Sequence, residues 1–141
     1  MKFATLFLLL LANASLHGQE PQMRYAIVVH GGAGSPPSAT DAARNIAKYD
    51  GLKQALEAGQ KILEAGGSSL DAVEAAIRLM EDNPVFNAGR GAVLNANGEA
   101  ELDASIMDGR TKKCGAVASA TRTRHPITVS RLIMEKTRHI L

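Results

Sequence analysis

A glycine-rich segment is the first place in the sequence where the residue types could support catalysis. The run from His30 to Gly34 reads His-Gly-Gly-Ala-Gly and follows the apolar stretch Tyr25–Val29. Such a segment allows three interpretations: a loop where backbone approaches a substrate, a nest of amides that binds an anion, or a tight turn without chemistry. It is not a phosphate loop, since no Gly-Lys-Ser/Thr follows, and it lacks the third glycine of a dinucleotide fingerprint.

Other chemistry-bearing residues give weaker signals. Asp103 and Asp108 could form the carboxylate pair of an acid/base enzyme. Because Asp103 is expected in a strand and Asp108 in a turn, structural hydrogen bonding is the favoured interpretation. His30 has no second histidine at metal-ligand spacing, so a zinc site is not expected. An esterase is excluded because the sequence holds no Gly-x-Ser-x-Gly nucleophile elbow.

Three further blocks point to one family. Residues 66–76 read GGSSLDAVEAA, residues 81–92 read EDNPVFNAGRGA, and residues 101–109 read ELDASIMDG. In order and spacing, these blocks and the glycine segment are similar to the plant-type L-asparaginase/isoaspartyl peptidase family. The resemblance covers roughly Tyr25 to Leu141, and several blocks in the correct order are far more specific than one glycine motif.

The resemblance implies an N-terminal-nucleophile hydrolase of the α/β (α+β) class, with a four-layer αββα sandwich that is incomplete in this chain. Such enzymes are made as precursors that cut their own backbone before a threonine. The freed α-amino group, with an ordinary pKa of about 8, can take the proton of the threonine hydroxyl. The hydroxyl would attack the side-chain amide of asparagine or the β-aspartyl amide of an isoaspartyl dipeptide, and nearby donors would stabilise the oxyanion.

The expected nucleophile is not found in this sequence. The family's threonine follows Gly or Asp and precedes Val-Gly-like residues, whereas the threonines here follow Ala, Arg, Ile or Lys. They are Thr5, Thr40, Thr111, Thr121, Thr123, Thr128 and Thr137. We therefore expect no catalytic residue in this chain, an inactive chain by itself, and a truncated N-terminal part of an α subunit over residues 19–141. The family's substrate-binding arginine and aspartate also belong downstream, and Arg90 does not replace them.

The resemblance implies supporting residues instead. His30, Gly31 and Gly32 match the glycine loop beside the nucleophile, although a simple glycine turn is an equally good interpretation. Asn87 matches an asparagine that helps to hold the nucleophile region. No cofactor is implied for catalysis, but relatives wrap a structural sodium ion in backbone carbonyls, and hard cations favour such oxygen ligands. The matching carbonyls are those of Met80, Glu81, Asn83, Phe86, Ala88 and Arg90. Arg90 departs from the apolar or small residue that relatives often carry.

Composition limits the classes of molecule that this protein is expected to bind. The 141 residues are 45% hydrophobic and 21% charged, with a formal net charge of only +2 and no basic block, so a nucleic-acid partner is not expected. The single cysteine, Cys114, cannot close an intramolecular disulfide. The resemblance implies a small-molecule substrate, asparagine or a β-aspartyl peptide, for the complete enzyme. It also implies pairing with the enzyme's own β subunit and a homodimer of αβ units.

Residues 1–18 have the pattern of a secretory signal peptide. Met1-Lys2 precedes the apolar run Phe3–Leu11, and Ala12-Asn13-Ala14 forms an A-x-A cleavage pattern. Cleavage is expected after Ala14 or Gly18. A membrane anchor is the alternative, but the run is about half of the ~20 residues that span a bilayer. We expect export to the periplasm or the extracellular space, with no membrane segment after cleavage.

Local patterns predict alternating helices and strands. A strand over 24–30 should precede a loop with a short helix over 38–47 and a helix over 50–65. Ser68 or Ser69 should cap a second helix that Asn83-Pro84 ends, with Leu70, Val73, Ala76, Ile77 and Met80 as its buried stripe. Hairpin turns are expected at Asn97-Gly98, which leads into a strand near 101–108, and at Asp108-Gly109, between that strand and one near 114–121. A helix over 126–136 and the start of a strand at 139–141 complete the pattern.

Two alternatives to the main interpretation remain. Glycosylasparaginase shares the implied fold and is often exported, but its branch usually begins differently from the HGGAG opening seen here. A noncatalytic secreted module could keep the fold without the nucleophile. The end of the sequence inside an expected strand favours truncation over such a module, because an exposed strand edge invites aggregation.

Overall fold

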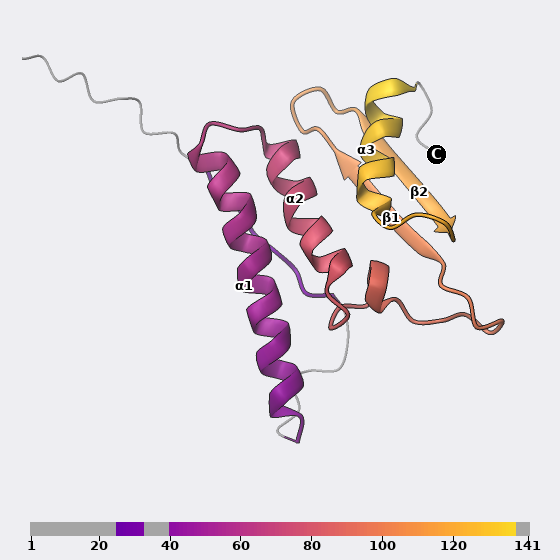
Figure 1. The fold of residues 1–141 in the computed structure, drawn as a ribbon. Coiled ribbons are helices and arrows are strands. Elements are labelled where there is room, and N and C mark those ends of the chain that lie inside the picture. Colours follow the sequence, from indigo (N-terminus) through magenta and orange to yellow (C-terminus); the bar gives the residue numbers. More distant parts are fainter. Residues whose placement is uncertain (1–24, 33–39, 138–141) are drawn as a thin grey trace, which may run out of the picture.

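The computed structural model describes residues 25–32 and 40–137, in which helices precede a β-hairpin and a last helix packs on the hairpin (Figure 1). The elements are α1 (Ala42–Glu64), α2 (Ser69–Asp82), the 3₁₀ turn η1 (Gly89–Gly91), β1 (Leu102–Met107), β2 (Cys114–Ala120) and α3 (Pro126–Lys136). This agrees with a mixed helix-and-strand class. The predicted signal peptide, residues 1–18, and the strand start at 139–141 lie outside the described residues. No helix in the described part is both long and apolar enough to span a membrane.

Helix α1 is longer than predicted. The side chain of Asp41 accepts a hydrogen bond from the Arg44 amide at 3.2 Å, so the helix begins at Ala42. One continuous helix therefore covers residues for which a loop containing a short helix was predicted. It then continues through Gly51, a residue that weakens isolated helices. Gly51 is buried, and a Cβ there would lie 2.8 Å from the Phe86 ring. Close packing against Phe86 therefore explains why glycine occurs inside this helix.

Helix α2 starts where the sequence predicts. Ser68 caps it in a reciprocal capping box: the Asp71 amide donates to the Ser68 hydroxyl at 3.1 Å, and the Ser68 amide donates to Asp71 Oδ2 at 3.4 Å. The helix ends at Asp82, directly before the predicted Asn83-Pro84 break. Both ends of α2 were thus set by local sequence signals.

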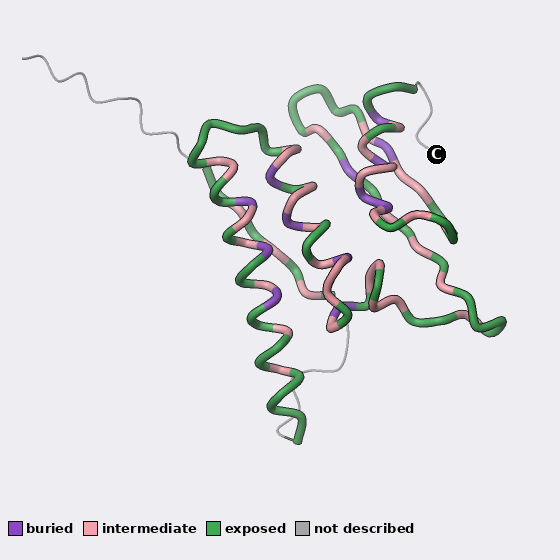
Figure 2. The backbone as a smooth tube through the Cα atoms, viewed as in Figure 1, coloured by how far each residue is buried: buried purple, intermediate pink, exposed green. Residues whose placement is uncertain are grey.

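Small residues form the seam between α1 and α2. Ala55 and Gly59 of α1 and Ala72 and Ala76 of α2 are buried. The buried stretches of the two helices lie on the sides that face each other (Figure 2). A Cβ at Gly59 would lie 3.2 Å from the carbonyl oxygen of Ala72. The predicted stripe is wrong at Val73, which is 39% exposed, because the close helix contact selects small side chains rather than large ones.

The predicted strand over 24–30 is not formed in its described part, residues 25–30. Val28 is 90% exposed, although the apolar run predicted a buried strand. Among the described residues the only sheet is the β1–β2 pair, so this segment has no strand to pair with. It runs along the helical pair instead (Figure 1), and Ile27 contacts Gly59 at the seam.

Both predicted hairpin turns are confirmed. Gly98 has a φ of +78°, its amide donates to the Asn95 carbonyl at 3.0 Å, and Leu94 bridges to Ala100. The turn at Asp108 joins β1 to β2 as an antiparallel pair, with Met107 opposite Cys114. Pro126 occupies the first turn of α3, as its fixed φ favours.

Helix α3 packs directly on the hairpin. Ile106, Ile127 and Met134 form a buried cluster, and the half-buried Leu70, Ile77 and Ala104 pack against it. The cluster therefore joins α2, β1 and α3. Gly115 of β2 is buried under α3, where a Cβ would overlap the Ser130 carbonyl oxygen and lie 2.6 Å from the Met134 amide nitrogen.

We predict that Gly115→Ala lowers the free energy of unfolding by ~3 kcal/mol or more, the upper end of the usual cost of overpacking. The obstructing atoms belong to the α3 backbone and cannot rotate away. Urea titration followed by circular dichroism measures the change. Gly109→Ala is the matched control, since a Cβ at Gly109 meets nothing within 4 Å. Equal stabilities of the two variants would contradict this packing.

Candidate functional site

The glycine segment lies against the middle of α1. A Cβ at Gly31 would lie 3.2 Å from both Leu52 Cδ1 and Lys48 Cε, and Gly32 has a φ of +91°. The Gly32 amide donates to Nδ1 of His30 at 3.3 Å, which closes a tight local turn. Beside it lies a cavity of about 210 Å³. Its lining residues are His30, Gly31, Gly32, Asn45, Lys48, Tyr49 and Leu52.

Asn87 belongs to the loop that follows α2. Its Oδ1 accepts a hydrogen bond from the Val93 amide at 2.9 Å and so ties the two ends of the η1 turn together. The preceding Phe86 is buried against Gly51 of α1, one residue from the Leu52 contact of Gly31. The structure thus brings the two predicted regions to the same turn of α1, although the hydrogen bonds of His30 and Asn87 are local to each loop.

The predicted cation loop curls so that its carbonyl oxygens face glycines. Gly89, with a φ of +49°, would place a Cβ 2.5 Å from the carbonyl oxygen of Glu81. Gly91 would place one against the carbonyl oxygen of Phe86 and 2.6 Å from that of Pro84. Only residues without a Cβ allow this close approach of backbone to backbone.

Three of the carbonyls that the sequence assigns to a cation already accept a hydrogen bond. The carbonyls of Met80, Asn83 and Ala88 accept backbone hydrogen bonds from Asn83, Phe86 and Gly91 at 3.2, 3.2 and 3.0 Å. A carbonyl oxygen has two lone pairs, so each keeps capacity for a hard cation. Across residues 25–32 and 40–137, no three His, Cys, Asp or Glu side chains converge to hold a metal. A cation in this loop would therefore rely on backbone oxygens.

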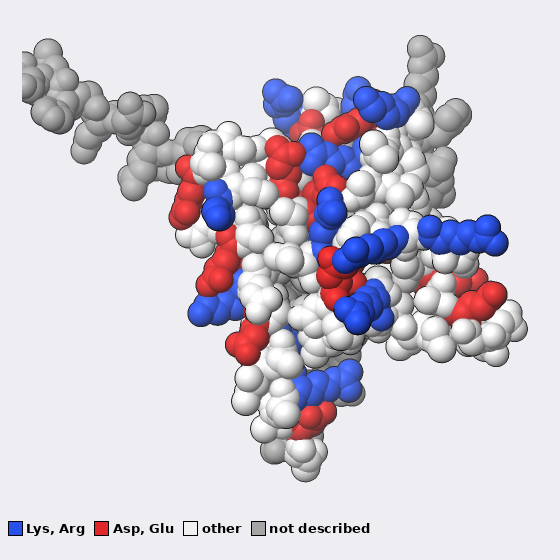
Figure 3. Space-filling model, viewed as in Figure 1, with Lys and Arg blue, Asp and Glu red and all other residues white. Residues whose placement is uncertain are grey.

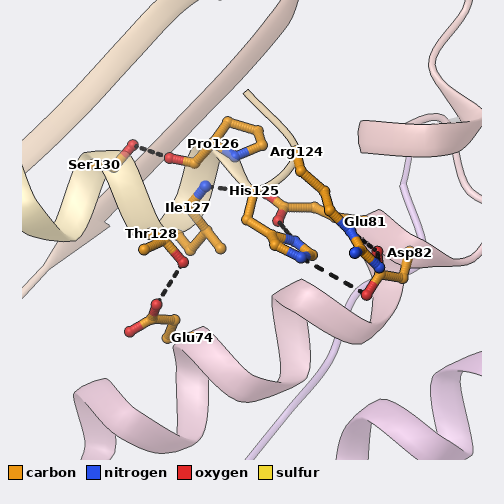
Figure 4. A network of polar contacts seen from close by, with 9 residues as sticks. All are labelled: Glu74, Glu81, Asp82, Arg124, His125, Pro126, Ile127, Thr128 and Ser130. Carbon is orange, nitrogen blue, oxygen red and sulfur yellow. Dashed lines mark hydrogen bonds and ion pairs between the residues drawn. The ribbon is translucent and has the colours of Figure 1, made fainter. Parts of the chain in front are cut away.

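The side chain of Glu81 points away from that loop toward α3 (Figure 4). It is 3% exposed, and Oε1 accepts a hydrogen bond from the Ile127 amide at 3.0 Å in the first turn of α3. Oε2 lies 3.0 Å from Nδ1 of His125, the N-cap residue of α3. His125 has no side-chain capping bond of its own, so a carboxylate from α2 caps this helix.

Further polar contacts link α2 to α3. Glu74 accepts from the Thr128 hydroxyl at 2.6 Å and from Arg131 Nη1 at 2.8 Å. Arg131 also lies 2.7 Å from Asp71 Oδ1 and 2.8 Å from Glu135 Oε1. Acidic and basic side chains accordingly mingle over the face where the two helices meet (Figure 3). One guanidinium thus ties together three carboxylates from two helices.

Titration of these carboxylates follows from their surroundings. Burial raises the pKa of Glu81 above its ordinary value, while the Ile127 amide and His125 act in the opposite direction. The Ser68 hydroxyl, and then Arg131, hold the pKa of Asp71 below its ordinary value. Glu81 therefore carries a desolvation cost that its donors offset only in part, whereas Asp71 is stabilised in its charged form.

The carboxylate pair considered from the sequence is structural, as expected. Asp103 Oδ1 accepts from the amide of Ser119, whose φ of +51° marks an irregularity in the hairpin. Asp108 accepts from the Arg110 amide at 3.0 Å and from the Thr111 hydroxyl at 2.7 Å, which closes the β1–β2 turn. Each carboxylate is thus occupied by local structure.

The sequence did not predict the polar contacts between α2 and α3. It assigned Glu81 only a backbone role and gave no role to Glu74 or Arg131. A signal was present, because Asp71, Glu74 and Glu81 are spaced by three and seven residues and therefore share one face of α2. The partner of that face could not be identified, since α3 lies more than forty residues further along the chain.

The geometry defines a mixed helix-and-strand protein in which the glycine segment and the loop after α2 both lie against α1. The chain belongs to the asparaginase family, whose model matches residues 23–141. The resemblance seen in its motifs is thereby confirmed.

Curated relatives agree with this assignment. The chain is 51% identical over 114 residues to an isoaspartyl peptidase/L-asparaginase of Danio rerio, covering 81% of this chain and 36% of the relative. It is 48% identical over 116 residues to an isoaspartyl peptidase of Salmonella typhimurium and 49% identical over 116 residues to a plant-type L-asparaginase of Pyrococcus horikoshii. Each of these two matches covers 82% of this chain and 37% of the relative. The chain thus spans little more than a third of the length of these relatives.

We predict that Asp71→Asn removes part of the acid dependence of stability. A pKa that is lowered in the folded state contributes stability above the ordinary value of about 3.9, and that contribution is lost as the pH falls through the lowered pKa. The stability difference between the wild type and the variant should therefore be constant above about pH 5 and shrink below about pH 4. Urea titrations from pH 3 to 7 measure it. The exposed Asp50 provides the control, Asp50→Asn, and a pH-independent difference for Asp71→Asn would contradict the prediction.

For the loop after α2, we predict that Asn87→Ala speeds hydrogen exchange of the Val93 amide by about fivefold or more, the factor expected for loss of a hydrogen bond worth about 1 kcal/mol. Asn87→Asp retains an acceptor oxygen and should leave the exchange close to that of the wild type. Amide exchange followed by NMR makes the comparison. Unchanged exchange in Asn87→Ala would show that this side chain does not hold the loop.

Proposed function

We propose that this chain supplies the supporting part of an amidohydrolase that cleaves the side-chain amide of asparagine, the β-aspartyl bond of isoaspartyl dipeptides, or both. The observation that carries the proposal is the family match over residues 23–141, together with relatives of about 50% identity that bear these activities in their names. The placement of the glycine segment and the Asn87 loop on one turn of α1 supports it. In this proposal both loops flank the nucleophile.

Hydrolysis in this proposal uses a threonine released by self-cleavage. No threonine of the chain has the required sequence context, so the nucleophile belongs to the part of the relatives that this chain does not span. The threonine amine would accept the hydroxyl proton, and the alkoxide would attack the amide carbonyl to give an acyl-enzyme and a free amine. Water would then release the acid. His30 to Gly32 and Asn87 would keep the nucleophile region in place without touching the reacting atoms.

The proposal includes a structural sodium ion in the loop after α2. Its ligands would be the backbone carbonyls of Met80, Glu81, Asn83, Phe86, Ala88 and Arg90. The close approach of Gly89 and Gly91 to carbonyl oxygens of this set supports it. The ion would hold the loop together through these oxygens and would take no part in amide cleavage.

Export and assembly complete the proposal. Residues 1–18 would direct the protein to the periplasm or the extracellular space and would be removed after Ala14 or Gly18. In the working enzyme, the β subunit would pair with this part and complete the αββα sandwich. Two αβ units would then form a homodimer. Several large apolar side chains support a need for further chain, since Ile46, Tyr49, Val93 and Leu94 are each more than 60% exposed.

A chimera tests the function. Residues 23–141 of this chain are joined to the remaining sequence of the Danio rerio relative, and L-asparagine, a β-aspartyl dipeptide and a sugar-linked asparagine are supplied as substrates. We predict self-cleavage before a threonine, seen by mass spectrometry, and release of ammonia or the free amino acid from the first two substrates. The 141-residue chain alone should show no hydrolysis above the buffer rate.

The unmodified relative serves as the positive control for this assay. A chimera that folds but neither cleaves itself nor hydrolyses the amides would contradict the proposal. Preferential cleavage of the sugar-linked asparagine would favour the glycosylasparaginase alternative, and hydrolysis by the 141-residue chain alone would overturn the assignment of the nucleophile.

A further inference from the structure

Glu81 takes part in two structures at once. Its carbonyl oxygen lies against Gly89 in the carbonyl-lined loop, while its buried carboxylate holds the Ile127 amide and the His125 ring at the start of α3. Neighbouring Asp82 strengthens the α3 side, because its Oδ1 accepts two bonds from Arg124 at 3.0 and 2.9 Å. The last turn of α2 is therefore fixed from both sides.

We infer that Glu81 is a positioning residue that links cation binding in the 80–90 loop to docking of α3 on α2. This inference rests on the sodium site proposed above, but not on the reaction that the complete enzyme carries out. The proposed sodium site uses only the carbonyl of Glu81, whereas the inference gives a role to its carboxylate.

The link follows from the rigidity of a single residue. With both carboxylate oxygens engaged in a buried site, the side chain anchors the Glu81 backbone in the last turn of α2, and the helical conformation of that turn sets the direction of its carbonyl. A cation that binds this carbonyl favours the same direction. Two events that favour one arrangement must assist each other, and by thermodynamic reciprocity each strengthens the other by the same factor.

A matched control is present two helical turns earlier. Glu74 also bridges α2 to α3, through Thr128 and Arg131, but lies seven residues before Glu81 and away from the loop. Glu74→Gln therefore weakens the α2–α3 contact without touching the carbonyl-lined loop. Any loss of cation affinity caused by loose packing of α3 in general would appear in both variants.

A second variant separates positioning from charge. Glu81→Gln removes a negative charge, which by itself would weaken binding of a cation. His125→Ala leaves the carboxylate in place and removes one of its two anchors. Loss of cation affinity in His125→Ala would therefore arise from freedom of Glu81 and not from a missing charge.

The experiment titrates the full chain with sodium chloride at constant ionic strength, with choline chloride as the replacement salt, and follows the ²³Na NMR line width. We expect Glu81→Gln and His125→Ala to weaken sodium binding by about tenfold, within the usual range for linked sites. Glu74→Gln should stay within about twofold of the wild type. In the wild type, saturating sodium should slow hydrogen exchange of the Ile127 amide by a similar factor.

If the wild type binds sodium, three results would overturn the inference. They are unchanged sodium affinity in both Glu81→Gln and His125→Ala, an equal loss in Glu74→Gln, and exchange of the Ile127 amide that does not respond to sodium. If Glu81→Gln fails to fold by circular dichroism, His125→Ala and the Ile127 exchange of the wild type decide the matter. Absence of sodium binding to the wild type would also overturn it, while the chimera assay would still report separately on the hydrolase activity.

Discussion

A buried carboxylate, that of Glu81, joins the helical pair to the rest of the described structure. Taking a carboxylate out of water is costly, and the cost is offset only when donors surround it. Here the donors are the Ile127 amide and His125 at the start of α3. Because α3 also covers the β1–β2 hairpin, the orientation of the hairpin relative to α1 and α2 depends on this contact as well as on the small apolar cluster around Ile127.

Elsewhere in the described structure, neighbouring elements pack closely through small residues. Small residues allow close contacts at each layer: Gly59 against Ala72 between the helices, Gly115 beneath α3, and Gly89 against the Glu81 carbonyl. With few aromatic residues available, the chain gains contact by bringing backbones together rather than by filling space with rings. The same close contacts shape the loop after α2, and the two regions predicted to support an active site lie on the same turn of α1.

Local signals predicted the elements that depend on neighbouring residues only. The Ser68 cap, the Asn97-Gly98 turn and the proline at the start of α3 determined element ends correctly, since each acts within a few residues. Features set by distant partners could not be predicted. The run before His30 had the composition of a strand but no strand to pair with among the described residues, and the role of the Glu81 side chain required knowledge of where α3 packs.

A double-mutant cycle between Glu81 and His125 tests the central claim most directly. The free energies of unfolding of the wild type, Glu81→Gln, His125→Ala and the double variant are measured by urea titration at pH 7. We expect an interaction energy of about 1 kcal/mol or more, because the two side chains share a buried contact. Changes that add within about 0.5 kcal/mol would contradict it and would show that α2 and α3 are joined by the apolar cluster and by the contacts of Glu74 and Arg131 rather than by this pair.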